Sequence, residues 1–216
     1  MNRIGSFGQE LVRKGVALQT LTDAQIISTS EVDPSRFGEI FDRHFPAIHR
    51  YVNRRVGREL ADDLTSETFS VAFSNRGRFD PTRSSASPWL YGIAANLLRD
   101  HHRSERRRLL AYAKTGVDPV LDGGFDAVDA RLDASTAGPA VARALSRLKP
   151  SDREALLLYA WADLTYREIG EALAIPVGTV RSRLSRARRQ VHNTLAASGT
   201  FPDHIRTHER EGSTDG

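Results

Sequence analysis

The sequence predicts an all-α protein with two small helical domains joined by an extended acidic linker. Three observations carry this prediction. Apolar residues recur at three- and four-residue spacing through residues 36–108 and again through 139–196, which is the pattern of amphipathic helices. Alternating runs of β-branched residues, which would indicate strands, are absent. Between the two stretches, residues 109–138 collect aspartate, glycine and proline instead.

Composition fits this architecture and excludes several classes of protein. Hydrophobic residues make up 39% of the 216 residues, which is low for one compact domain and suits two small ones. The absence of cysteine excludes disulfides, thiolate nucleophiles and cysteine-ligated metals. No apolar run approaches the roughly 18 residues of a membrane span, and the first 30 residues lack the pattern of a secretory signal. We therefore expect a cytoplasmic protein without membrane insertion.

The net charge of +4 conceals a strong preference for arginine. Of the 31 basic residues only three, Lys14, Lys114 and Lys149, are lysines, so arginine makes up the other 28. Arginine suits bidentate contacts with phosphates and bases. A genome rich in G and C would produce the same bias, so composition alone leaves both explanations open.

The chain is expected to begin with a poorly ordered extension, residues 1–35. Its apolar pattern is weak, and Asp33-Pro34 interrupts any helix there.

Three helices are expected in the first domain, residues 36–108. They span residues 36–56, 62–75 and about 89–110, and residues 76–88 interrupt them with glycine and proline. The apolar faces of these helices are formed by Phe37, Ile40, Phe41, Ile48, Leu64, Phe69, Leu90, Ile93 and Leu98.

A polar linker and a polar tail flank the second domain. Residues 109–138 contain five aspartates between 118 and 133 against one base, Arg131, and read as an extended acidic linker. Residues 197–216 are expected to form a disordered tail.

The second domain, residues 139–196, should contain four short helices. Ser151 with Glu154, and Thr165 with Glu168, have the spacing of a capping box and predict two helix starts. Pro176 closes the helix that begins at Thr165, because proline cannot continue a helix.

The last two helices, residues 165–173 and 178–195, form a helix-turn-helix pattern. Five arginines and no acid lie between residues 178 and 190. The N-terminal half of the second helix of such a motif enters the major groove, where arginine commonly contacts guanine. A solvated basic helix face is the alternative. The candidate base-contacting residues are Thr179, Arg181, Ser182, Ser185 and Arg186.

The first domain carries an acidic and a basic patch. The acids Glu59, Asp62, Asp63 and Glu67 could complement a helix dipole. Asp63 and Glu67 also repel one another at i, i+4, an arrangement that a basic partner would relieve. The third helix is rich in arginine downstream of Phe79, Trp89 and Tyr91, which suits stacking on single-stranded bases unless the aromatics are core residues.

Three runs of residues resemble one known family. The run 61–69, ADDLTSETF, resembles the core-polymerase-binding motif of bacterial sigma factors. The run 88–100, PWLYGIAANLLRD, is similar to their region that melts and reads the −10 element, and 164–189 to their −35-reading helix-turn-helix. A chain with only these two domains resembles the extracytoplasmic-function group of the sigma-70 family.

The resemblance implies roles for particular residues. The clamp of core RNA polymerase would be contacted by Asp63, Leu64 and Glu67, with Asp62 beside them. The chain would also contact the flap of the polymerase. The acidic linker would thread near the active-site channel of the polymerase. Arg181, Ser182 and Arg186 fall at −35 contact positions. The residues implied for the −10 element are Asn96 in the pocket for a flipped base, Arg99, Asp100 and Arg103 nearby, and Phe79 capping or stacking on that base.

We therefore expect an alternative sigma factor that binds core RNA polymerase and directs promoter-specific initiation. It should need no cofactor or metal and should not be an enzyme. A dimeric helix-turn-helix regulator, which would bind a palindrome without polymerase, is the main alternative. An enzyme with a nucleic-acid-binding appendage would need a catalytic constellation, and the sequence contains none. Whether an anti-sigma factor holds the chain inactive, as is common in the group, stays open.

Overall fold

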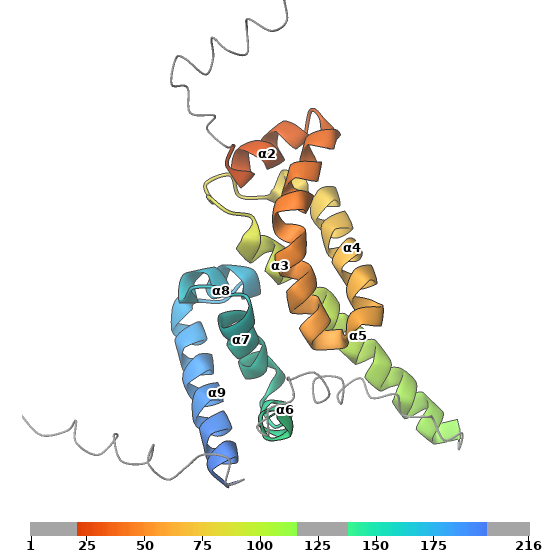
Figure 1. Cartoon of the computed structure of the whole chain (residues 1–216), viewed down its shortest axis with the longest axis vertical. Coiled ribbons are helices and arrows are strands. Elements are labelled where there is room, and N and C mark those ends of the chain that lie inside the picture. The colour runs from red at the N-terminus through yellow and green to blue at the C-terminus, as the bar shows by residue number, and fades with distance from the viewer. Residues whose placement is uncertain (1–20, 116–137, 198–216) are drawn as a thin grey trace, which may run out of the picture.

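The computed structural model describes residues 21–115 and 138–197, and every regular element within them is a helix (Figure 1). The predicted all-α fold is therefore confirmed. Two short 3₁₀ turns, Pro34–Phe37 and Arg76–Arg78, join helices of the first domain. The helices are α2 (Asp23–Ser30), α3 (Gly38–Val56), α4 (Arg58–Ser74), α5 (Ser87–Thr115), α6 (Gly138–Ser146), α7 (Pro150–Trp161), α8 (Tyr166–Leu173) and α9 (Val177–Ala197).

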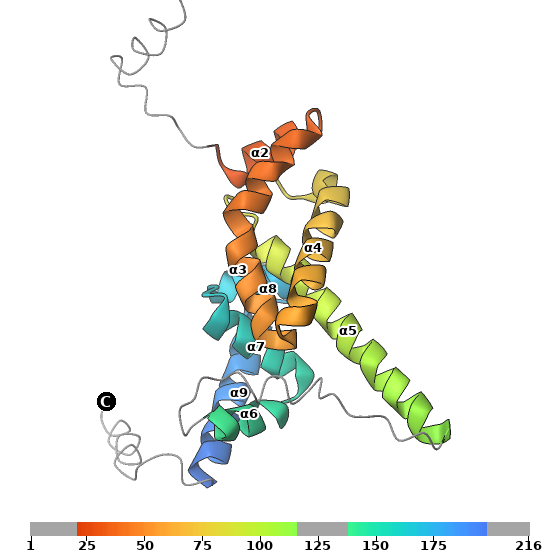
Figure 2. The same ribbon diagram turned by 45° about the vertical axis from the view of Figure 1, so that its right-hand side comes forward.

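The first domain is a bundle in which α3 and α4 lie side by side and α5 packs against both (Figures 1 and 2). Its apolar stripes face inward as the three- and four-residue spacing predicts. Helix α5 is longer than expected and continues to Thr115, so the segment 109–115 is helical rather than linker. The rest of the predicted linker and the tail after Ala197 lie outside the described residues.

Helix α2 corrects the prediction of a poorly ordered N-terminal extension, at least for residues 21–35. Ile26 and Ile27 of this helix are buried in the core of the first domain. Thr22 caps it and forms a complete capping box with Gln25. The helix has only 8 residues, which is too short for its periodicity to stand out in the sequence. Residues 1–20 lie outside the described part of the chain.

Asp23 fastens α2 to the bundle. Its buried carboxylate accepts hydrogen bonds from His44 Nε2 at 2.7 Å, the Ala86 amide at 2.8 Å and Arg43 Nη1 at 3.2 Å. Burial alone would raise the pKa of Asp23, but the hydrogen bonds from His44, Ala86 and Arg43 outweigh it and lower the pKa to about 2. One ionised side chain thus joins α2, α3 and the segment that precedes α5.

We expect Asp23→Asn to lower the free energy of unfolding by about 2 kcal/mol at pH 7. A depressed carboxyl pKa stabilises the fold above the unfolded-state pKa, and this contribution is lost as pH falls through the folded-state pKa. The difference between wild type and variant should therefore be full above about pH 4 and shrink towards pH 2. Urea unfolding at pH 7, 4 and 3 measures it, and a difference that does not change with pH would contradict the assignment.

The second domain confirms the helix-turn-helix geometry. Thr165 caps α8, and its capping box with Glu168 is present as predicted. Ala174 ends α8 in the left-handed conformation with φ of 52°, and the Ile175 amide donates to the Gly170 carbonyl at 2.9 Å. A Cβ atom at Gly170 would lie 2.9 Å from the Ile175 carbonyl oxygen, so this turn favours glycine.

The capping box expected at Ser151 is wrong. Helix α7 begins at Pro150, and its N-cap residue Lys149 makes no side-chain capping bond. Proline needs no amide partner at the first helical position, which removes one demand for a side-chain cap. Glu154 is buried and turns instead towards the first domain.

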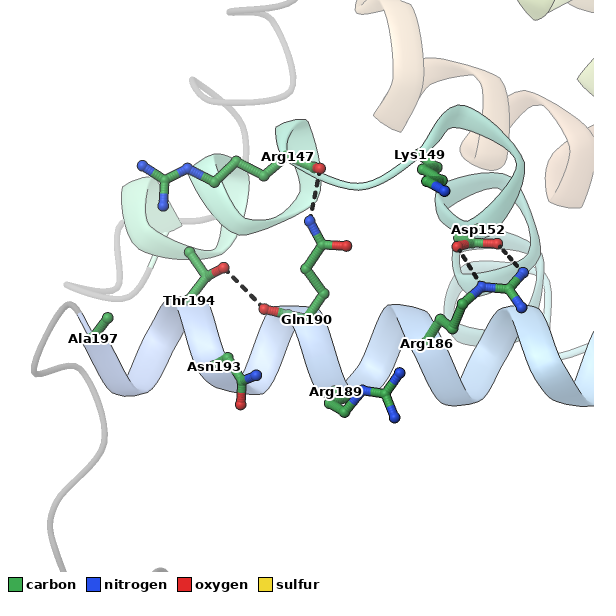
Figure 3. Close-up of a pocket in the computed structure, with 9 residues that line it drawn as sticks. All are labelled: Arg147, Lys149, Asp152, Arg186, Arg189, Gln190, Asn193, Thr194 and Ala197. Carbon is green, nitrogen blue, oxygen red and sulfur yellow. Dashed lines mark hydrogen bonds and ion pairs between the residues drawn. The ribbon is translucent and has the colours of Figure 1, made fainter.

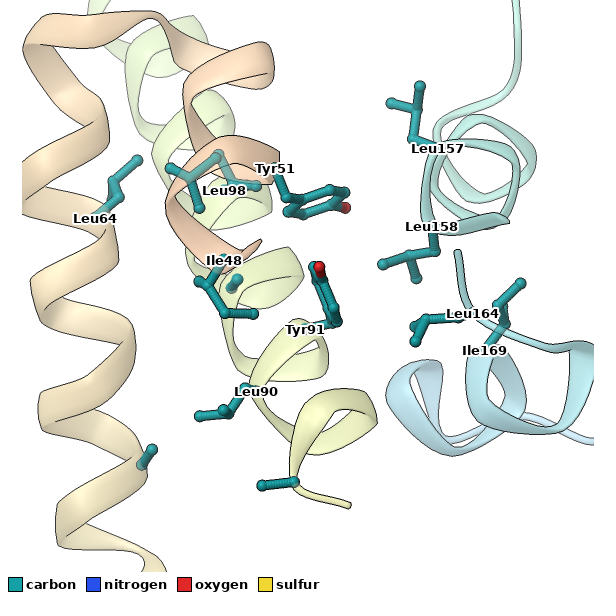
Figure 4. Packing of buried hydrophobic residues seen from close by; sticks show 14 of the residues in the cluster. Ile48, Tyr51, Leu64, Leu90, Tyr91, Leu98, Leu157, Leu158, Leu164 and Ile169 are labelled. Carbon is teal, nitrogen blue, oxygen red and sulfur yellow. The ribbon is translucent and has the colours of Figure 1, made fainter. Parts of the chain in front are cut away.

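The two domains share one continuous apolar core. Tyr51 of α3 and Tyr91 of α5 point towards the second domain, where Leu157, Leu158 and Ile169 face them (Figure 4). The two tyrosine rings meet edge to face with centroids 5.2 Å apart. The sequence predicted two helical domains but not this contact between them.

Candidate protein and nucleic-acid interfaces

The acidic patch lies on the outer face of α4. Asp62, Asp63 and Glu67 are exposed, and Asp62 contacts His49 Nε2 at 2.9 Å. Within the ranges that the structure describes, neither Asp63 nor Glu67 forms an ion pair, so both charges are available to a partner. Leu64 is only 8% exposed and packs into the core, so its contact with a partner stays a prediction.

Aromatic side chains of α3 and α4 lie on the same face of the bundle as Asp62. The ring of Phe41 is 4.9 Å from Phe69 and 4.8 Å from Phe45, measured between centroids. Phe41 and Phe73 nevertheless remain 39% and 36% exposed. Exposed apolar surface beside unpaired acids is suited to a partner helix with both basic and apolar residues.

The basic stretch of α5 presents its polar residues to solvent. Asn96, Arg99, Asp100 and Arg103 are all exposed, at the spacing of one helix side. Arg99 Nη2 donates to Asn96 Oδ1 at 2.7 Å, which orients the amide of Asn96. The structure thus brings together four of the five residues that the family resemblance implies for the −10 element.

Phe79, the fifth, is buried rather than presented to a base. It is 8% exposed, and its ring centroid lies 5.2 Å from that of Trp89. Phe79 directly follows the 3₁₀ turn at Arg76–Arg78, and its side chain faces inward. In this conformation Phe79 is packed against Trp89, and its contact with an unpaired base stays a prediction.

The second helix of the helix-turn-helix, α9, exposes a row of polar residues. Val180 and Leu184 are buried against the rest of the domain, so the opposite face of α9 points to solvent. Ser182 donates its hydroxyl hydrogen to the Thr179 carbonyl at 2.9 Å, so its outward oxygen can still accept. The exposed or partly exposed residues of this row are Thr179, Arg181, Ser182, Ser185 and Arg186.

Arg186 differs from the others because it is paired within the domain. Its Nε and Nη2 atoms donate to the two carboxylate oxygens of Asp152 at 3.1 and 2.9 Å (Figure 3). The Asp152 side chain is 4% exposed, so Arg186 neutralises a buried charge. Arg186 therefore anchors α9 to α7, a role that its position in the sequence does not predict.

A basic cavity of about 350 Å³ adjoins this ion pair. Arg147, Lys149 and Arg189 line it beside Gln190, whose side chain donates to the Arg147 carbonyl at 2.8 Å. Several arginine and lysine side chains this close together beside α9 are suited to binding phosphate groups.

A second basic cavity, of about 590 Å³, lies between the two domains. Helix α5 contributes Arg99 and Arg103, and the second domain contributes Arg153 and Arg183. This groove could not be predicted from the sequence because its walls lie far apart in the chain. In the part of the chain that is described, no group of three or more His, Cys, Asp or Glu side chains could hold a metal ion. None of the described helices is long and apolar enough to cross a membrane.

Comparisons with known proteins agree with this division of the chain. Residues 40–108 match the model of sigma-70 region 2, and residues 139–191 match that of sigma-70, region 4. The ECF RNA polymerase sigma factor SigE of Mycolicibacterium smegmatis is 32% identical over 163 residues, covering 73% of this chain and 61% of SigE. The chain thus spans about three-fifths of that relative.

Two further comparisons cover more of the related protein. The RNA polymerase sigma factor CarQ of Myxococcus xanthus is 32% identical over 165 residues, covering 74% of this chain and 88% of CarQ. The solved structure of CnrH in complex with the cytosolic domain of CnrY matches 81% of this chain and 97% of that chain, with a TM-score of 0.57 and 24% identity. This last similarity supports the fold.

Proposed function

Because the chain belongs to the extracytoplasmic-function group of RNA polymerase sigma factors in the sigma-70 family, we propose that it binds core RNA polymerase and directs initiation at promoters with −35 and −10 elements. The observation that carries this proposal is that one chain presents two different binding surfaces. The acidic face of α4, on which Asp63 and Glu67 form no ion pair within the described residues, lies in one matched region, and the exposed, arginine-rich α9 lies in the other. The polymerase performs the chemistry, and this chain supplies recognition.

The polymerase contact is assigned to α4. Asp63 and Glu67, with Asp62 beside them, would attract basic residues of the polymerase clamp. Phe41 and Phe73 would add apolar contact at the same bundle face. Opposite charges at such an interface accelerate association and fix its register.

The −35 contact is assigned to α9 and the −10 contact to α5. Arg181, with Thr179, Ser182 and Ser185, would reach base edges in the major groove. While its Nε and Nη2 atoms hold Asp152, Arg186 can still offer its Nη1 atom to a base or a phosphate. In α5, Asn96 would hydrogen-bond a flipped base while the nearby arginines hold the single strand; the unpairing costs a few kcal/mol, which pocket contacts offset.

Run-off transcription with purified core polymerase and a promoter library tests this function. We expect transcripts only when the full chain is added, from templates that share two boxes. A dimeric regulator, the alternative from the sequence, would bind a palindrome alone and yield no new start site. An anti-sigma partner belongs to the same proposal, and adding a candidate inhibitor to this assay would test it.

A further inference from the structure

A chain of hydrogen bonds links three separate helices of the first domain. His44 of α3 contacts Asp23 of α2 through Nε2 at 2.7 Å and Ser87, the first residue of α5, through Nδ1 at 3.3 Å. A carboxylate only accepts, so Nε2–H donates to Asp23, and Nδ1 of the neutral ring accepts the hydroxyl hydrogen of Ser87. The side chains of His44 and Asp23 are only 13% and 9% exposed. The imidazole therefore cannot turn without breaking a contact at one end of this Asp23–His44–Ser87 relay.

The carboxylate at the start of the relay also holds the loop that leads into α5, residues 79–86. The amide of Ala86, the last residue of this loop, donates to Asp23 Oδ2 at 2.8 Å. Ala86 is completely buried. The end of the loop and the first residue of α5 are therefore both connected to Asp23, one directly and the other through His44.

The rest of this loop is ordered, although its middle is open to solvent. At its start, the ring of Phe79 packs against Trp89 with centroids 5.2 Å apart. Within it, Asp80 Oδ1 accepts hydrogen bonds from the amide of Thr82 at 3.0 Å and from its hydroxyl at 2.7 Å. The exposed residues of the loop are Asp80, Pro81, Thr82 and Ser84. An exposed loop that is braced in one conformation is suited to recognition, because little ordering remains to be done on binding.

Helix α2 lies outside residues 40–108, the part of the chain that matches sigma-70 region 2. Ile26 and Ile27 already bury this helix against the bundle. Packing alone would not require Asp23 to be buried as well, since burial of a carboxylate costs free energy unless it is hydrogen-bonded. The contacts of Asp23 with His44 and Ala86 therefore point to a need for exact placement of the loop and of the start of α5.

A carboxylate, an imidazole and a hydroxyl in this order also form the constellation of serine hydrolases. Such an enzyme needs a cleft that brings a substrate to the hydroxyl. Ser87 lines neither the cavity of about 350 Å³ beside α9 nor the groove of about 590 Å³ between the domains. Neither of these two cavities gives the constellation the access that catalysis requires.

We propose that the Asp23–His44–Ser87 relay positions the loop 79–86 and the first turn of α5 for recognition of the −10 element. This proposal rests on the proposed function. Asp23 and His44 touch no base themselves and act through the loop and the start of α5. Asn96 lies on the same helix as Ser87, and Phe79 begins the loop, so displacement of the loop changes the surface that the unpaired strand meets. Helix α2 thereby becomes part of the machinery that reads the promoter.

Hydrogen exchange of the free, full chain tests the positioning without polymerase. We expect His44→Ala to speed exchange of the amides of residues 82–87 about 10-fold, because the start of α5 loses its connection to Asp23. The amides of α4, which the relay does not touch, should exchange as in the wild type. Unchanged exchange at residues 82–87 would overturn the proposal.

Promoter opening by the holoenzyme tests the consequence for recognition. A fluorescent adenine analogue in the −10 element reports the opening rate on templates with an intact or a substituted −10 box. We expect His44→Ala to lower the ratio of these two rates about 10-fold, whereas the corresponding ratio for the −35 box stays at the wild-type value. His44→Gln retains an amide that can donate to Asp23 and should recover most of the loss. Ser87→Ala removes only the second contact and should fall between His44→Ala and the wild type.

Ile48→Val is the matched control for loss of stability. Ile48 is 1% exposed in the core of the same domain, so this change destabilises the bundle without altering the relay. It should keep both ratios of opening rates at the wild-type value. An equal fall of the −10 ratio in Ile48→Val and His44→Ala would show general destabilisation and overturn the proposal. If the wild-type chain itself supports no initiation, the proposed function fails, while the exchange experiment still decides whether the relay holds the loop.

Discussion

Charge reversal in the double variant Asp63→Arg/Glu67→Arg is expected to abolish binding to core RNA polymerase while the chain still folds. Both residues are exposed on α4 and form no ion pair within the described residues, so the fold loses no contact. They also repel each other at i, i+4 in the wild type, and two arginines repel to a similar extent. Arginine is a good helix former, which keeps α4 intact.

The expected loss of affinity for polymerase is large because attraction is replaced by repulsion at two positions. Like charges placed opposite one another at an interface cost several kcal/mol. Two such sites should weaken the complex at least about 1000-fold, which amounts to loss of binding at micromolar concentrations. Fluorescence anisotropy of the labelled chain titrated with core polymerase measures the change.

A control with the same change in net charge separates this interface from general electrostatics. Glu31→Arg/Asp42→Arg reverses two exposed acids, one at the end of α2 and one on α3, outside the α4 face. We expect it to bind polymerase within a few-fold of wild type. Normal holoenzyme assembly by the Asp63→Arg/Glu67→Arg variant would refute the assignment of α4 to the clamp.

The sequence predicted those helices whose signal lies in neighbouring residues. The spacing of Ile40 and Ile48 predicted α3, and both residues are buried. Thr165 and Glu168 predicted the start of α8, because a capping box needs only residues three apart. Helix α2 was not predicted because its 8 residues are too few for a clear periodicity and because the partners of Asp23, His44 and Ala86, lie far away in the chain.

The errors at the sites have one physical cause. Glu154 has the spacing of a capping residue, yet its partner Arg55 lies 99 positions away in the chain. Arg186 has the position of a base-contacting residue, yet Asp152 of α7 holds it. In both cases a buried charge elsewhere in the fold outweighed the local preference, since an unpaired buried charge costs more than a cap or an exposed contact contributes.

Arg181→Ala is expected to reduce discrimination of the −35 element by about 1–3 kcal/mol, which is about 5- to 150-fold in relative promoter strength. Arg181 lies next to buried Val180 near the start of α9, is exposed, and has no ion pair within the described residues. Its guanidinium is therefore free to donate to a guanine, as arginines at this part of a recognition helix do. Run-off transcription from templates with intact and scrambled −35 boxes measures the ratio.

Arg186→Ala supplies the comparison that makes this result specific. Because Arg186 neutralises the buried carboxylate of Asp152, its removal should lower the melting temperature of the chain. Arg181→Ala should leave the melting temperature unchanged and alter only the dependence on the −35 box. If Arg181→Ala kept the wild-type footprint over that box, base recognition would have to be assigned to other residues of α9. If Arg186→Ala altered the footprint without any loss of stability, the pair with Asp152 would be dispensable, and Arg186 would return to the set of base-contacting residues.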